Sequence, residues 1–132
     1  MRSKTLAVAA AVAALAAVPA ATAGTMHPEL GARLSGMGEH GVVNLTVHAA
    51  QHRLCWTFDL HVMHPLGATI RDAHGITVAH LGHMYRAKGC AMEPKQSLAL
   101  IESKPSRYWV WVATKGHPGD LRGRLFAGMA HM

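Results

Sequence analysis

The chain has 132 residues, of which 13 are Lys or Arg, 7 are Asp or Glu and 11 are His, giving a formal net charge of +6 with His neutral. This length is enough for one domain. The positive charge is spread over the chain without a run of basic residues or interleaved aromatics, which argues against a nucleic-acid-binding protein.

Residues 1–23 are typical of a secretory signal peptide. Arg2 and Lys4 precede an apolar run, Leu6–Val18, and Ala21-Thr22-Ala23 matches a cleavage site. The apolar run is shorter than the roughly 20 residues that a membrane span needs. We therefore expect an exported protein, periplasmic or extracellular, whose mature domain at 24–132 has no transmembrane segment. An uncleaved anchor is the alternative.

Hydrophobic residues that alternate with period two predict a series of short strands. The longest is Arg53–Met63, which should turn Trp56 and Phe58 toward the core. Gly82–Pro94 is expected to be a loop, and Gln96–Glu102 has the composition of a two-turn helix. The other expected strands are 32–37, 42–48, 68–71 and 76–81. Short strands separated by turns, with one short helix, indicate an all-β sandwich.

The stretch Pro105–Phe126 is predicted to form a hairpin that completes the core. Tyr108 begins an alternating strand, Lys115–Gly119 contains turn residues, and a second alternating strand follows. Trp109 and Trp111 share the face opposite Tyr108. Because two exposed tryptophans side by side would form an adhesive patch, we expect a loop to cover them as part of the core, with binding of a ligand as the alternative.

The two cysteines, Cys55 and Cys90, both follow the expected signal peptide. An even pair in an exported chain predicts a disulfide. Such a disulfide would close the loop from Cys55 to Cys90, and the chain-entropy model assigns a loop of this size roughly 3–4 kcal/mol of stabilisation. Free thiols that bind copper are the alternative, although the spacing is not CxxC.

Several motifs resemble the chordin-type (CHRD) domain, most closely its bacterial exported single-domain members, over about residues 34–126. They are L-C-W-T-F from Leu54, A-T-I-R-D-A-H-G-I-T-V-A-H-L from Ala68, and the late stretch that includes Y-W-V-W-V-A-T and R-G-R-L. The resemblance implies an immunoglobulin-like or dismutase-like antiparallel β-sandwich and fits a Cys55–Cys90 pairing. It assigns no partner, since one fold serves many functions.

The sequence departs from this family at positions that matter for metal binding. Thr69 and Arg71 stand where relatives carry the two histidines of Ala-His-Ile-His. Trp111 and Ala113 replace a later Asn and His, and Arg124 replaces a Gln. If those histidines bind a metal in relatives, this chain does not form the same site.

Histidine and methionine are nevertheless abundant, and together they suit copper. We considered a site in which the loops after two strands bring four histidines together with a soft thioether ligand. The candidate ligands are His61, Met63, His64, His80, His83 and Met84. The alternative is that these side chains are ordinary polar surface residues.

The remaining candidates are structural. Arg122 is expected to pair with Asp59 or Asp120 and so fix the register of the last strand, with an active-site role as the alternative. Gly123 is expected to be a packing glycine. No serine lies in a nucleophile-elbow context. The sequence therefore favours a binding or structural module for an unknown protein or surface ligand over an enzyme, with a copper-binding protein as the alternative and a dismutase-type enzyme as a distant option.

Overall fold

The computed structural model describes residues 28–36, 38–62, 64–115 and 117–131. The expected signal peptide lies outside them. In the described part of the chain, no helix is long and apolar enough to span a bilayer.

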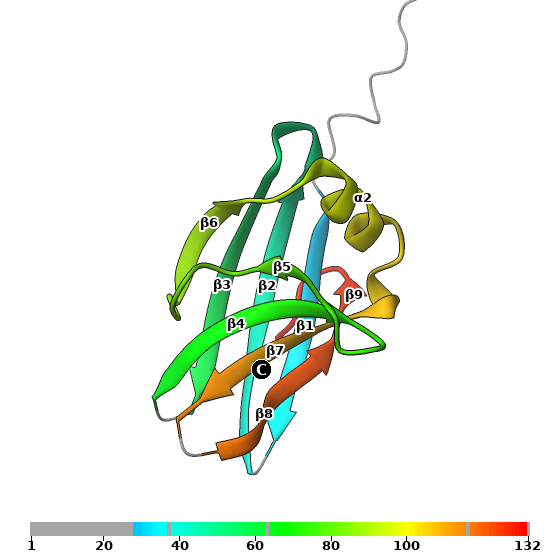
Figure 1. Cartoon of the computed structure of the whole chain (residues 1–132). Coiled ribbons are helices and arrows are strands. Elements are labelled where there is room, and N and C mark those ends of the chain that lie inside the picture. Colours follow the sequence, from blue (N-terminus) through cyan, green and yellow to red (C-terminus); the bar gives the residue numbers. More distant parts are fainter. Residues whose placement is uncertain (1–27, 37, 63, 116, 132) are drawn as a thin grey trace, which may run out of the picture.

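Over the described residues, the fold is all-β with one short α-helix, as the sequence predicts (Figure 1). Nine strands in this part of the chain form one antiparallel sheet in the order β5-β4-β7-β8-β1-β2-β3-β6, and β9 pairs with β1. The strands are β1 (Glu29–Gly36), β2 (Glu39–His48), β3 (Arg53–His61), β4 (Pro65–Asp72), β5 (Thr77–His80), β6 (Lys88–Met92), β7 (Tyr108–Thr114), β8 (His117–Arg124) and β9 (Phe126–Ala127).

The sheet curls so that its two halves face each other across one hydrophobic core (Figure 1). One half, formed by β1, β2 and β3, contributes fully buried side chains such as Val43 and Leu54. The other half contributes Ile70 from β4 and Val110 from β7. Every second residue of each strand points inward, because side chains alternate between the two faces of a strand.

The long strand β3 confirms the predicted inward face. Leu54, Trp56 and Phe58 are buried, while Leu60 and Val62 pack against the core with partial exposure. The indole N–H of Trp56 donates to the carbonyl of Arg86 at 3.0 Å. This bond satisfies the one polar group of a large buried side chain.

The helix α2 (Lys95–Ser103) covers one end of the core between the two halves of the sheet (Figure 1). Leu98 and Ile101 are its buried residues, three apart and so on one face of the helix. Short 3-10 turns at Ala49–Gln51 and Pro105–Arg107 lie against it.

The segment expected to be a loop, Gly82–Pro94, contains strand β6. This strand extends the sheet beside β3, with Cys90 directly opposite Cys55. The two cysteines form the predicted disulfide, so they are not free thiols that bind copper.

The predicted hairpin at Pro105–Phe126 is confirmed as β7 and β8, paired from Trp109↔Arg124 to Thr114↔His117. Tyr108 begins β7 and packs against the core with partial exposure. The hairpin lies in the middle of the sheet, between β4 on one side and β1 on the other.

Candidate functional site

The outward face of β4, β7 and β8 is the most distinctive surface of the molecule. Along β7, Val110 and Val112 are fully buried, so Trp109 and Trp111 point to the opposite face and remain half-buried. Along β8, Leu121 is buried while Arg122 and Arg124 are exposed. Period-two alternation on two neighbouring strands thus places tryptophan and arginine side chains on one surface.

The strand register interleaves these residues. Trp109 lies between Arg71 of β4 and Arg124 of β8, and Trp111 lies between Thr69 and Arg122. The guanidinium carbon of Arg71 is 4.6 Å from the ring centroid of Trp111, that of Arg122 is 5.0 Å from the same ring, and that of Arg124 is 4.8 Å from Trp109. Each distance lies within the range of a cation–π contact. We call Arg71, Trp109, Trp111, Arg122 and Arg124 the Arg–Trp face.

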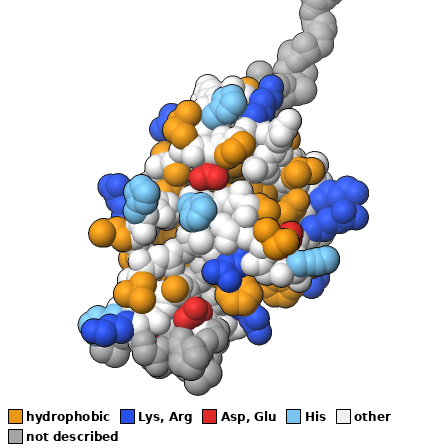
Figure 2. All heavy atoms as spheres, viewed as in Figure 1, with side chains coloured by type: hydrophobic (Ala, Val, Ile, Leu, Met, Phe, Trp, Pro, Cys, Tyr) orange, Lys and Arg blue, Asp and Glu red, His pale blue; other side chains and the backbone are white. Residues whose placement is uncertain are grey.

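The expectation that the two tryptophans belong to a covered core is wrong, since both stay half-buried on the outer face of the sheet. Guanidinium groups lie over their rings instead, those of Arg71 and Arg122 over Trp111 and that of Arg124 over Trp109. Figure 2 shows Lys or Arg side chains beside hydrophobic ones over this part of the surface. The sheet therefore keeps the large apolar rings on its outer side without a bare hydrophobic patch.

The expected ion pair of Arg122 with Asp59 or Asp120 is not formed among the described residues, and the guanidinium lies over Trp111 instead. A carboxylate oxygen of Asp120 accepts a hydrogen bond from the backbone N–H of Thr114 at 3.2 Å. The ion-pair partner of Asp59 is His61, with 3.7 Å between Oδ1 and Nε2. Among the described residues, no carboxylate forms an ion pair with an arginine of the Arg–Trp face.

An open hollow of about 800 Å³ lies over this face. Four members of the Arg–Trp face line it, namely both tryptophans, Arg122 and Arg124. Its rim carries hydroxyl, imidazole, carboxylate and further guanidinium groups from Tyr108, Ser106, His74, Asp72 and Arg107. The lining of the hollow thus combines arginine side chains with residues that can form hydrogen bonds.

Asp72 stabilises the turn at the edge of the hollow. Its Oδ1 accepts hydrogen bonds from the backbone N–H groups of His74 at 2.8 Å and Ile76 at 3.0 Å. The bond from Ile76 is the largest cause that lowers the pKa of this carboxyl. The carboxylate is therefore ionised at neutral pH.

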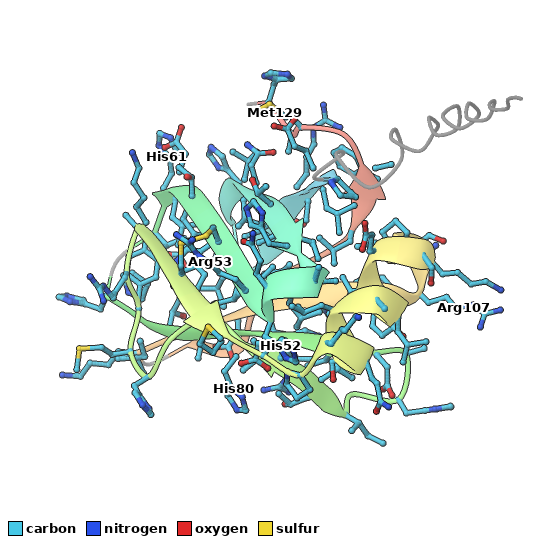
Figure 3. The ribbon with its side chains drawn as sticks, turned by 90° about the horizontal axis from the view of Figure 1, so that it is seen from above. His52, Arg53, His61, His80, Arg107 and Met129 are labelled. Atoms are coloured by element: carbon cyan, nitrogen blue, oxygen red, sulfur yellow. A yellow bond between two sulfur atoms is a disulfide. The ribbon has the colours of Figure 1, made fainter. Side chains whose placement is uncertain are left out.

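The candidate copper ligands lie in different parts of the molecule. His61, at the end of β3, stacks on His40 with 5.1 Å between ring centroids and 11° between planes. His80, at the end of β5, lies on the other half of the sheet and points the opposite way (Figure 3). His64 lies between β3 and β4 with a φ of 54°. Met63 lies outside the described residues.

The structure brings together three of the six candidates. His80, His83 and Met84 line a second hollow beside Met92 and Glu93. In the described ranges, no three His, Cys, Asp or Glu side chains are close enough to hold a metal ion. A single site that joins His61 and His64 to His80 and His83 is therefore not formed.

Sequence reasoning missed the Arg–Trp face because its members come from three separate strands. Arg71 is far from Trp111 in the sequence, and only the pairing of β4 with β7 brings them together. One signal was present in the sequence. Trp109 and Trp111 alternate with buried valines, and Arg122 and Arg124 alternate in the partner strand, so any simple hairpin places the two pairs on one face.

Comparison with protein-family models, with curated proteins and with solved structures found no match. The proposals below therefore rest on the residues of this chain and on their geometry.

Proposed function

We propose that this chain is a binding module that recognises anionic ligands through its Arg–Trp face. The observation that carries the proposal is the position of three guanidinium groups over two tryptophans, with the guanidinium carbons 4.6–5.0 Å from the ring centroids. A guanidinium has five N–H donors, and a cation–π contact with a ring leaves N–H groups at its edge available. Those edges match the oxygens of a carboxylate, sulfate or phosphate, which they bind in pairs.

The tryptophans also reduce the cost of binding. A free arginine side chain loses much rotamer freedom when it grips a ligand, whereas one already held against a ring loses less. The Nε of Arg71 donates to Thr69 Oγ1 at 3.1 Å, which restricts this side chain further. The Arg–Trp face is thus a partly preorganised set of anion-binding groups.

Binding fits this face better than catalysis. Guanidinium and indole groups neither act as nucleophiles nor exchange protons near neutral pH. An exported binding or structural module of the chordin type, which the sequence motifs suggest, is compatible with this proposal.

The test is affinity for a panel of polyanions, namely polygalacturonate, heparin, polyphosphate and single-stranded DNA, measured at low salt. We expect at least one to bind, and the double variant Arg122→Gln/Arg124→Gln to weaken that binding at least tenfold. The control Arg86→Gln/Lys104→Gln removes the same charge from exposed positions elsewhere and should change the affinity less than threefold. Equal losses in both variants, or no binding at all, would refute the proposal.

One observation favours a second candidate, a copper-binding function. Two histidines and two methionines line the hollow beside β5 and β6, and thioether sulfur favours Cu(I). In a competition titration with Cu(I), Met84→Leu should weaken binding at least tenfold. His61→Gln, on the other half of the sheet, should leave the affinity unchanged. Affinity no tighter than that of a generic histidine-rich surface, or equal loss in both variants, would exclude this candidate.

A further inference from the structure

We infer that the ligand of the Arg–Trp face is an acidic polysaccharide, a chain of sugar rings that carries carboxylate or sulfate groups. This inference rests on the proposed function and specifies its ligand. It depends on three properties of the face, which are its extent, the hydroxyl-binding groups at its rim and the occupied faces of its tryptophans.

The cationic groups extend too far for one small anion. Neighbouring strands lie about 4.8 Å apart, so the backbones of Arg71 on β4 and Arg124 on β8 are separated by roughly 10 Å. Ser35 of β1 lies opposite Arg122, which places Arg33 beside Arg124 on the next strand. Arg33 is exposed, and its guanidinium carbon lies 5.9 Å from the ring centroid of Phe126. Arginines thus lie on β4, β8 and β1, three of four neighbouring strands. This spread suits an extended ligand with repeated negative charges.

The rim suits a ligand that also carries hydroxyl groups. Ser106 also lines the hollow, and Asp72 has a second carboxylate oxygen beyond the one that its turn uses. A carboxylate accepts hydrogen bonds from sugar hydroxyls but repels a neighbouring phosphate. A ligand with alternating anionic and hydroxyl groups satisfies both parts of the hollow, whereas polyphosphate does not.

The tryptophans argue against single-stranded nucleic acid. Proteins that bind single strands offer free aromatic faces on which bases stack. Here Arg71 and Arg122 both lie over Trp111, and Arg124 lies over Trp109. Base stacking on Trp111 would have to displace a guanidinium, and one guanidinium already lies over Trp109, so the face favours anionic groups over bases.

The experiment compares dissociation constants of the full chain at about physiological salt for ligands matched in total charge. The probes are polygalacturonate for carboxylates, heparin for sulfates, polyphosphate and oligo(dT). We expect at least one polysaccharide to bind at least tenfold more tightly than polyphosphate and oligo(dT). The stronger of the two polysaccharides identifies the acidic group.

Two variants test the arginines of the Arg–Trp face and the rim of the hollow separately. Arg122→Lys/Arg124→Lys keeps the charge but loses the planar guanidinium group. It should weaken polysaccharide binding at least fivefold. Asp72→Asn keeps the side-chain oxygen that its turn needs and removes the negative charge. It should strengthen polyphosphate binding relative to polysaccharide binding.

The outcomes separate this inference from the proposed function. Equal affinity for all four polyanions, lost in Arg122→Gln/Arg124→Gln, would overturn the polysaccharide inference and leave an anion-binding face. Preference for oligo(dT) or polyphosphate would overturn it in favour of that ligand. Absence of binding to every probe, even at low salt, would overturn both.

Discussion

At the scale of single residues, the Arg–Trp face explains how two large aromatic side chains are tolerated on the outside of a sheet. Each cation–π contact contributes about 0.5–1 kcal/mol at an exposed site. The guanidinium groups over the rings also remove part of the indole surface from water. Arg71, Arg122 and Arg124 therefore have a structural effect even without a ligand.

Gly123 helps to position this face, because it lies in β8 between Arg122 and Arg124. A Cβ at Gly123 would collide with the backbone carbonyl of Arg33 and come within 3.2 Å of Leu34 Cδ2. The two strands β1 and β8 approach closely here only because the side chain is missing. The packing role expected of this glycine follows from that approach.

We therefore expect Gly123→Ala to lower the free energy of unfolding by about 1–3 kcal/mol, because one strand must shift. Gly67→Ala is the matched control, since a Cβ at Gly67 in β4 meets nothing within 4 Å. Its effect should stay within about 0.5 kcal/mol. Urea denaturation of both variants gives the comparison. A Gly123→Ala variant as stable as the control would show that the strands adjust without cost.

At the scale of elements, the features that depend only on nearby residues were predicted from the sequence. The core-facing side of β3, the helix α2 and the hairpin of β7 and β8 follow from alternation, helix-forming composition and turn residues. Strand β6 escaped prediction because Lys88–Met92 is only five residues long, contains Gly89 and lies at the edge of the sheet. Its pairing with β3 supplies the strand character that its composition lacks.

The Arg–Trp face and the proposed copper site depend on how the strands pair. The sequence of a single strand does not specify its partner or its register. Trp109 and Trp111 were recognised as sharing a face, but the arginines opposite them come from β4 and β8. The four histidines of the copper hypothesis failed to assemble for the same reason, since β3 and β5 belong to different halves of the sheet. Nearness in the sequence, as between His61 and His64, does not predict which strands become neighbours.

At the scale of the whole molecule, β5 and β6 are the two ends of a nearly closed sheet. One link across this gap is the hydrogen bond from the backbone N–H of His80 to Glu93 Oε2, at 3.4 Å. The Cys55–Cys90 disulfide holds β6 against β3 on one side of the gap. The Arg–Trp face lies on β4, β7 and β8, in the part of the sheet away from the disulfide.

Removing the disulfide should therefore weaken the fold without changing the binding face. We expect Cys55→Ser/Cys90→Ser to lower the free energy of unfolding by about 2–4 kcal/mol, because the unfolded chain regains the freedom of a loop that spans a sequence separation of 35. Amide exchange should accelerate most in β6, where strand pairing alone then holds the edge. Under conditions in which the variant stays folded, its affinity for a polyanion should remain within threefold of that of the native protein. A loss of affinity as large as that of Arg122→Gln/Arg124→Gln would mean that the two ends of the sheet are coupled through the core.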